Sequence, residues 1–268
     1  MNIKLKKLTA AIFAILLCCI SLVGCDINST VNDIGNSFLS TLEKEIGADS
    51  SQSVTSGTVS EIRNTVPSYL TLDDVPNFNG SPYVELNNNK PYFSESDMTT
   101  DSFESYAELD SLGRCGVCYA CIGQDIMPTE ERGKIGMVKP SGWHLSKYDF
   151  VNGKYLYNRC HLIGYQLAGE NANEKNLITG TRYLNVDGML PFENEVADYV
   201  HKTNNHVLYR VTPIFHGDNL VASGLTMEAY SVEDSGEGVC FCVYCYNAQP
   251  GVIIDYATGE NESDHTLE

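Results

Sequence analysis

The sequence predicts an α+β domain built on a central antiparallel sheet, and its C-terminal half carries the evidence. Residues 206–215, 220–232 and 239–246 are rich in β-branched and aromatic side chains, which favour strands. The turns between them, HGDN and DSG, are short and polar, and short connections join antiparallel neighbours. Residues 185–202 instead repeat apolar side chains at helical spacing, which adds a helix.

That helix has a defined apolar face and a defined start. Met189, Phe192, Val196 and Val200 recur every three or four residues, so they share one side of a helix. Pro191 then falls in the first turn, where a missing backbone N–H leaves no hydrogen bond unmade.

The N-terminus has the features of a bacterial lipoprotein signal peptide. Three lysines within the first seven residues precede an apolar run from Leu8 to Val23. The sequence LVGC at 22–25 resembles the lipobox, in which the signal is cut before a cysteine whose thiol is then lipidated, here Cys25. The alternative is an uncleaved anchor, although its sixteen residues fall short of the roughly 20 needed to span a bilayer. Both interpretations tether the chain at the extracellular face of the bacterial membrane.

Composition divides the rest of the chain into three parts. Residues 25–65 are rich in Ser, Thr and Asn and predict a flexible tether. Residues 66–257 have a globular composition and are numerous enough to bury a core. Residues 258–268 form a polar, acidic stretch that predicts a tail. The N-terminal part of this domain shows weaker patterns, which predict short strands at 83–85 and 92–93 and a helix or irregular segment at 103–112.

The chain is strongly acidic, but its charge is unevenly distributed. Removing residues 1–24 takes away three lysines and no acids, which leaves 14 basic and 35 acidic side chains and a net charge of −21. Such a chain should bind nucleic acid poorly outside a dedicated site, because non-specific affinity comes from neutralised phosphates. Residues 132–182 reverse the balance with eight basic and three acidic side chains. This basic island predicts a focused anion site, with chance clustering as the alternative.

Ten cysteines raise the question of disulfides or a metal site. The run CGVCYAC at 115–121 has the two-residue spacing of zinc and iron–sulfur sites, but the nearby fourth cysteine and proline of the iron–sulfur pattern are missing. Disulfides or buried free thiols are the simpler interpretation, and structural zinc is the alternative. Seven cysteines follow the signal and Cys25, and because seven is odd, at least one of them must be a free thiol. They are Cys115, Cys118, Cys121, Cys160, Cys240, Cys242 and Cys245.

The segment YLYNRCHLIG at 155–164 contains the histidine of greatest interest. Strand alternation places Arg159 and His161 on one face with Tyr155 and Tyr157, and turns Asn158 and Cys160 with Leu156 to the other. Adjacent strand residues point in opposite directions, so a thiol dyad of Cys160 and His161 is excluded. His161 remains a general base, a metal ligand or a packed core side chain.

Residues 170–196 are dense in asparagine. An asparagine oxygen suits a hard cation that keeps most of its waters, although asparagines also cap turns and helices. Asn185 lies at the start of the expected helix and Glu193 about two turns later, so both side chains can border one site.

Together these motifs resemble the DNA/RNA non-specific endonuclease family, the ββα-metal or His-metal finger nucleases. The resemblance rests on NRCHLIG at 158–164, NEKNLITG at 173–180, Asn185 twenty-four residues after His161, and Glu193 eight further on. KPSGW and QPGVIIDYATG are similar to segments of the competence-type DNA-entry nucleases. The resemblance spans about residues 128–259 and implies that a strand–loop–helix finger beside the central sheet forms the active site.

The resemblance implies chemistry for three residues. His161 matches the general base that takes a proton from water, and Asn185 matches the ligand of one largely hydrated Mg²⁺, which Mn²⁺ can replace. Glu193 matches the acid that orients metal-bound water. The implied reaction is hydrolysis of phosphodiester bonds in DNA. Whether RNA is also a substrate is left open.

Four further residues match supporting positions of the family. Arg159 corresponds to an arginine near the phosphate, and Asn176 to an asparagine that supports the site. Arg132 and Arg182 are candidates for a second phosphate clamp. None of these residues reads a base edge, so the resemblance implies recognition of the sugar–phosphate backbone without sequence specificity.

The chain departs from the family pattern at two positions. Asn158 stands where the family usually has Asp, and Cys160 stands where it usually has Gly. Both fall on the expected inward face, which indicates altered packing and support around His161. A non-catalytic surface lipoprotein that keeps the fold as a binding module is therefore the alternative, and a zinc-stabilised module around CGVCYAC is a third. An inhibitor or uptake partner is left open.

Overall fold

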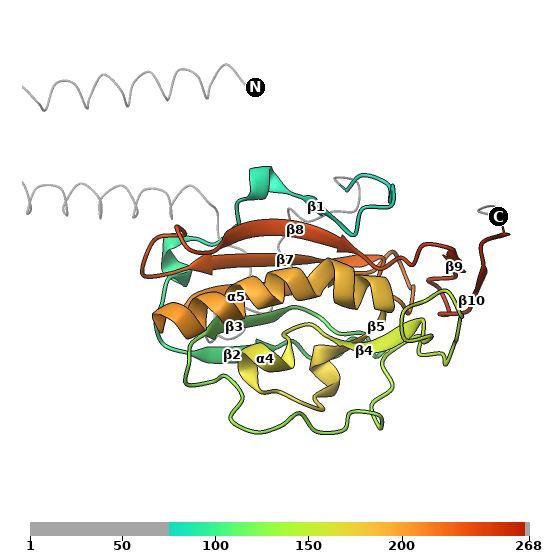
Figure 1. Ribbon diagram of the computed structural model, residues 1–268, viewed down its shortest axis with the longest axis horizontal. Helices are drawn as coiled ribbons and strands as arrows, with labels where there is room; N and C mark the ends of the chain where they lie inside the picture. The colour runs from blue at the N-terminus through green and yellow to red at the C-terminus, as the bar shows by residue number, and fades with distance from the viewer. Residues whose placement is uncertain (1–74, 266–268) are drawn as a thin grey trace, which may run out of the picture. The chain divides into compact units, whose positions relative to one another are not determined.

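The computed structural model describes residues 75–265, and its architecture is the expected α+β arrangement. A six-stranded sheet, antiparallel throughout, has the order β1-β8-β7-β6-β3-β2. Helix α5 runs along one face of it (Figure 1). The predicted signal peptide, Cys25 and the tether lie outside the described residues. The strands are β1 Tyr83–Glu85, β2 Phe103–Tyr106, β3 Cys118–Ile122, β6 Val207–Ile214, β7 Gly224–Ser231 and β8 Cys240–Tyr246.

Two smaller antiparallel sheets complete the fold. In the first, β4 (Tyr157–His161) pairs with β5 (Leu177–Thr181). In the second, β9 (Val252–Ile254) pairs with β10 (Asn261–Ser263). We use the name "finger" for β4, β5 and the helical segment that follows them. The helical segments are 3₁₀ turns η3 Asn87–Asn89, η4 Glu95–Asp97 and η5 Glu174–Asn176, α4 Tyr165–Ala168, the π-helix η6 Leu184–Met189 and α5 Leu190–Thr203.

The main core lies between the sheet, α5 and the finger. Val196 and Val200 of α5 are fully buried in one apolar cluster with Met227 of β7 and Leu162 beside β4. Since the same helical face carries Met189, the apolar spacing in the sequence correctly predicts which side packs inward. The finger is thus part of the core rather than an appendage.

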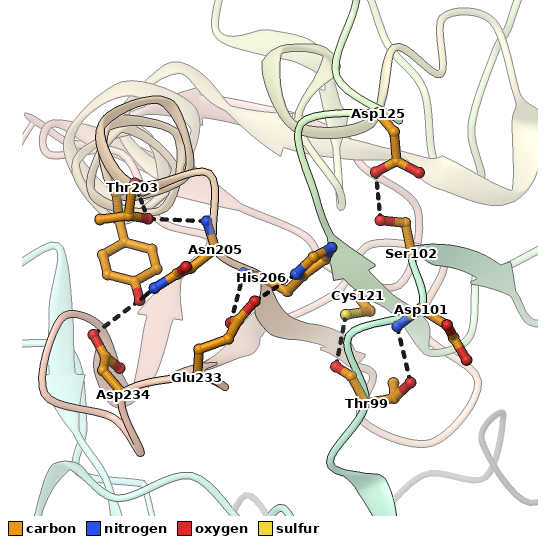
Figure 2. A network of polar contacts seen from close by, with 11 residues as sticks. Thr99, Asp101, Ser102, Cys121, Asp125, Thr203, Asn205, His206, Glu233 and Asp234 are labelled. Carbon is orange, nitrogen blue, oxygen red and sulfur yellow. Dashed lines mark hydrogen bonds and ion pairs between the residues drawn. The ribbon is translucent and has the colours of Figure 1, made fainter.

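Both ends of α5 follow from local sequence. Pro191 occupies its first turn, as expected. The helix stops at Asn204, which adopts the left-handed conformation with φ 59° and donates its N–H to the Val200 carbonyl at 2.9 Å. Beyond it, the main-chain N–H and ring Nδ1 of His206 lie 2.8 and 2.7 Å from the Glu233 carboxylate (Figure 2). This pair ties the exit of α5 to the turn after β7.

The sequence predicts the C-terminal half better than the N-terminal half. The three long strands, β1 and the helix are confirmed. The strand expected at 92–93 is absent, and the segment 103–112, expected as a helix or irregular, contains β2. The acidic tail expected from residue 258 is wrong up to residue 263, because β10 pairs with β9 and Gly259 accepts the Tyr157 hydroxyl at 3.0 Å.

The cysteines of the described region are all free thiols, and six of the seven are buried. The last four residues of the CGVCYAC run lie in β3, where Cys118 and Cys121 are core residues. Cys115 and Cys118 donate to main-chain carbonyls of Leu177 and Lys175. Between residues 75 and 265 no group of three or more His, Cys, Asp or Glu side chains is arranged to hold a metal. The simpler interpretation allowed disulfides or buried free thiols, and the described cysteines are free thiols, with Cys240 only partly buried.

One buried amide attaches the finger to the six-stranded sheet. Asn247, directly after β8, is fully buried. Its Oδ1 accepts from the Thr181 N–H at 2.8 Å, and its Nδ2 donates to the carbonyls of Thr179 and Ala222 at 3.0 and 2.9 Å. These bonds satisfy backbone groups of β5 that pairing with β4 leaves open, so the finger cannot shift without losing them.

We expect Asn247→Ala to lower the free energy of unfolding by about 3 kcal/mol, because three buried backbone groups lose their partner. Urea unfolding measures this change, and amide hydrogen exchange at Thr181 should accelerate. Asn79→Ala removes an exposed amide with one local bond and should stay within about 0.5 kcal/mol of the parent. Equal stabilities of the two variants would contradict this role for Asn247.

Candidate active site

A pocket of about 630 Å³ opens beside the finger. Its walls come from the loop before β4, from β4 itself, from the start of α4 and from the η6–α5 segment. It gathers six of the seven residues that the sequence proposes for catalysis, metal or substrate: Arg132, Arg159, His161, Arg182, Asn185 and Glu193. Tyr155, Tyr157 and Asn158 also line it, with Trp143 and Leu145 on the loop side.

His161 ends β4 and is held in one tautomer. Its Nε2 lies 2.7 Å from the carbonyl oxygen of Asn171, and a carbonyl can only accept, so Nε2 carries the proton. Nδ1 is therefore the basic nitrogen. Burial lowers the pKa of His161 to about 4, with the nearby Arg132 charge acting in the same direction and the Asn171 carbonyl opposing it. The ring is neutral at physiological pH and can accept a proton.

Arg132 contacts the basic nitrogen directly. Its Nη2 donates to Nδ1 of His161 at 3.2 Å. Arg132 lies on an exposed loop, which Tyr165 holds by donating its hydroxyl to the Glu130 carbonyl at 2.7 Å. The guanidinium therefore covers the unprotonated nitrogen of His161 from an exposed loop.

Glu193 reaches the pocket from the first turn of α5, next to the backbone of Gly164. A Cβ added to Gly164 would lie 2.8 Å from the Glu193 carboxyl carbon, so the glycine makes room for this side chain. Burial raises the pKa of Glu193 to about 7, and the Arg132 charge opposes the shift. The carboxylate is thus close to its titration point at neutral pH.

Asn185 enters the pocket from the π-helix η6, a wide turn of the kind often found at functional sites. Its Oδ1 accepts from the thiol of Cys160 at 3.1 Å. Cys160 is fully buried, as alternation predicts. The amide oxygen is therefore held from behind while the residue faces the pocket.

Asn176 supports the site without lining it. The side chain is fully buried, its Oδ1 accepts from the Ile163 N–H at 2.8 Å, and its Nδ2 donates to the Ile163 carbonyl at 2.9 Å. These two bonds fix the turn just after His161. Asn176 therefore holds the backbone beside His161 and does not line the pocket.

Arg159 and Arg182 contribute charge from the pocket wall. Arg159 donates to the carbonyls of Gly136 and Val138, and its guanidinium stacks 4.1 Å from the centre of the Trp143 ring. Trp143 is thus a pocket residue that braces an arginine. Arg182 has a buried Nε without a hydrogen-bond partner among the described residues.

Asn158 departs from the sequence expectation. Alternation assigns it to the inward face, but it lines the pocket, and its Nδ2 is buried without a partner in the described part of the chain. A two-stranded ribbon twists more than a wide sheet, so its two faces separate less cleanly than strict alternation implies. The carbonyl of Asn171 and the missing side chain of Gly164 were not predicted, because neither leaves a side-chain signal.

The profile of the DNA/RNA non-specific endonuclease family matches residues 94–233, just over half of the chain. The chain belongs to this family. It is accordingly a nucleic-acid hydrolase with DNA or RNA as its substrate class. This assignment agrees with the resemblance carried by His161, Asn185 and Glu193.

Two solved structures illustrate the likeness. NucA from Streptococcus agalactiae with a bound magnesium ion is 28% identical, with a TM-score of 0.59 over 67% of this chain and 86% of NucA. The Sda1 nuclease with a bound zinc ion is 23% identical, with a TM-score of 0.57 over 73% of this chain and all of Sda1, and it supports the fold alone.

Within residues 75–265, no helix has the length and apolar character needed to cross a bilayer.

Replacing Arg132 with Met should raise the pKa of His161, because it removes a positive charge and a donor from Nδ1. The value should remain below 6.5, since burial is the larger cause of its depression. The chemical shift of the His161 ring, followed by NMR against pH in the metal-free protein, measures this change. Arg182→Met removes a charge from the same pocket without touching His161 and serves as the control. An unchanged or lower pKa in Arg132→Met would contradict the contact.

Proposed function

We propose that this protein is a secreted, lipid-anchored and Mg²⁺-dependent endonuclease that cleaves DNA, and RNA as well, with His161 as general base. The observation that carries the proposal is the tautomer of His161, whose unprotonated Nδ1 faces a pocket shared with Asn185, Glu193 and three arginines. A packed core histidine would not present its unprotonated nitrogen to a pocket of this kind.

The donor set fits a hard, hydrated cation. Asn185 offers one neutral oxygen and Glu193 a carboxylate, both on the pocket wall. Zinc prefers nitrogen and sulfur ligands, and no cluster of such groups occurs in residues 75–265. An ion that keeps most of its waters needs few protein ligands, which favours Mg²⁺, with Mn²⁺ as a substitute. NucA, the relative described above, has a bound magnesium ion.

The side chains divide the work of hydrolysis. His161 accepts the proton of the attacking water at Nδ1, while the Nε2–H bond to Asn171 holds the ring and stabilises the imidazolium that forms. Asn185 would hold the cation and Glu193 would orient one of its waters; when bound, the cation would supply Lewis-acid stabilisation to the phosphate and the departing oxygen. The guanidinium of Arg132 moves from Nδ1 to a phosphate oxygen when substrate arrives, which frees the base at that moment.

Recognition rests on the phosphate backbone. Arg159 and Arg182 place positive charge where the pentacovalent state accumulates negative charge. The unpartnered Nδ2 of Asn158 offers an additional donor to a phosphate oxygen. None of these groups reads a base edge, so the proposal includes cleavage without sequence specificity.

The N-terminal sequence supports export and anchoring. A basic start, an apolar run and the LVGC sequence ending in Cys25 together favour cleavage and lipidation at that cysteine. The enzyme would then face outward from the membrane on the Ser/Thr/Asn-rich segment 25–65. Incorporation of labelled fatty acid into the protein, lost in Cys25→Ser, tests this part separately from catalysis.

The catalytic proposal predicts that His161→Ala lowers the rate of cleavage by 10²- to 10⁴-fold, the usual contribution of a general base. Supercoiled and linear DNA and a structured RNA are incubated with full-length protein and Mg²⁺, with and without chelator. His216→Ala, at an exposed histidine outside the pocket, should cleave like the parent.

Three outcomes would overturn the proposal. They are intact DNA and RNA with the parent protein, equal cleavage by His161→Ala, and cleavage that persists in chelator. Loss of activity in His216→Ala would show that the assay reports on folding rather than on the base.

A further inference from the structure

Cys160 stands at the back of the pocket with its thiol aimed at Asn185. Its Sγ lies 3.1 Å from Asn185 Oδ1, 3.4 Å from Met189 Sδ and 3.9 Å from the His161 carbonyl. A carbonyl oxygen is a better acceptor than a thioether, and the Asn185 oxygen is also the nearest of the three. The thiol proton therefore belongs to the contact with Asn185.

The thiol can only act as a donor in this position. The Asn185 carbonyl oxygen can only accept a hydrogen bond, so the Cys160 thiol is the donor in this contact. An S–H group selects the oxygen end of the Asn185 amide, because the Nδ2 end would set a donor against a donor.

The neighbourhood is shaped around this side chain. Gly180 faces it across the hairpin, and a Cβ added there would lie 2.6 Å from Cys160 Cβ and 3.2 Å from its Sγ. A carbonyl oxygen has two lone pairs, so one can accept the thiol proton while the other remains for a ligand in the pocket. A glycine at position 160, the residue usual in the family, would provide no donor.

We propose that Cys160 is a positioning residue that holds the Asn185 amide oxygen toward the cation by thiol hydrogen bonding. The inference rests on the proposed function, since it takes Asn185 as the metal ligand. Groups that orient a ligand from behind commonly change metal affinity by 10- to 100-fold when removed, and a thiol, as a weak donor, belongs at the lower end. Cys160 touches neither substrate nor Nδ1 of His161, so its effect falls on metal affinity.

The test compares Cys160→Ala, which removes the donor, with Cys160→Ser, which keeps one. Binding of Mn²⁺ to full-length protein is measured directly by electron paramagnetic resonance, and Mg²⁺ binding by calorimetry. We expect the metal Kd of Cys160→Ala to rise about tenfold and that of Cys160→Ser to stay within about twofold of the parent. At saturating Mg²⁺ the cleavage rate of Cys160→Ala should recover toward the parent value, with KM for DNA unchanged.

Cys118→Ala is the matched control, because it removes an equally buried thiol that donates to a main-chain carbonyl and lies outside the pocket. Thermal unfolding confirms that each variant is folded. Equal metal affinity of parent and Cys160→Ala, or Cys160→Ser binding as weakly as Cys160→Ala, would overturn the inference. Asn185→Ala separates the two levels: if it binds metal like the parent, the proposed metal site fails as well, and if it loses metal while Cys160→Ala does not, only the role of Cys160 fails.

Discussion

The attachment of the finger to the six-stranded sheet by the buried Asn247 amide is the constraint on which the pocket depends. A two-stranded ribbon is marginally stable alone, because half of its backbone groups face no partner strand. Asn247 supplies partners to Thr179 and Thr181 on β5, and these residues pair in register with Arg159 and Tyr157 on β4. A displacement of β5 would therefore move the strand that carries the catalytic candidates. The buried Asn176 amide bonds to the backbone in the same way at Ile163, two residues after His161.

Burial shifts the pKa values of His161 and Glu193 in opposite directions, and the Arg132 charge acts on both groups. Desolvation favours the neutral form of each group, which lowers the pKa of the histidine to about 4 and raises that of the carboxyl to about 7. The Arg132 charge adds to the effect of burial on His161 and opposes it on Glu193, so this side chain lowers the pKa of both groups. At neutral pH the pocket therefore contains a free base beside an acid near its titration point.

These shifts also affect stability with opposite signs. His161 titrates at 6.5 when unfolded, so the unfolded chain binds more protons between about pH 4 and 6.5, and the folded state loses stability as pH falls through that window. Glu193 titrates at 4.5 when unfolded, so the folded state binds more protons between 4.5 and 7 and loses stability as pH rises there. The two contributions offset one another in the overlapping range. With both a buried acid and a buried base in the pocket, the free energy of unfolding therefore depends less on pH in this range than it would with either group alone.

Sequence predicts the parts of this protein with a clear composition or period. Richness in β-branched and aromatic side chains, with the turn residues between them, locates β6, β7 and β8, and helical spacing with Pro191 locates α5. Strand β3 was not predicted, because its residues CYACI contain one β-branched side chain and its cysteine spacing resembles a metal motif. The pocket could be predicted only where side chains act: His161, Asn185 and Glu193 are recognisable, whereas the Asn171 carbonyl and the space beside Gly164 arise from the path of the backbone.

The charge distribution explains how an acidic protein can engage a polyanion. Two lysines of the basic island, Lys154 and Lys175, form surface ion pairs with Asp149 and Glu108. The pocket arginines Arg132, Arg159 and Arg182 have no carboxylate at ion-pair distance among the described residues. Unneutralised positive charge is thus concentrated where the phosphate would bind. With about three phosphates neutralised, the slope of log K against log salt would be about −3, far shallower than for proteins that grip DNA along a groove. Such a surface favours brief engagement of any sugar–phosphate segment over sustained binding, because most of the surrounding charge repels the strand once the pocket has released it.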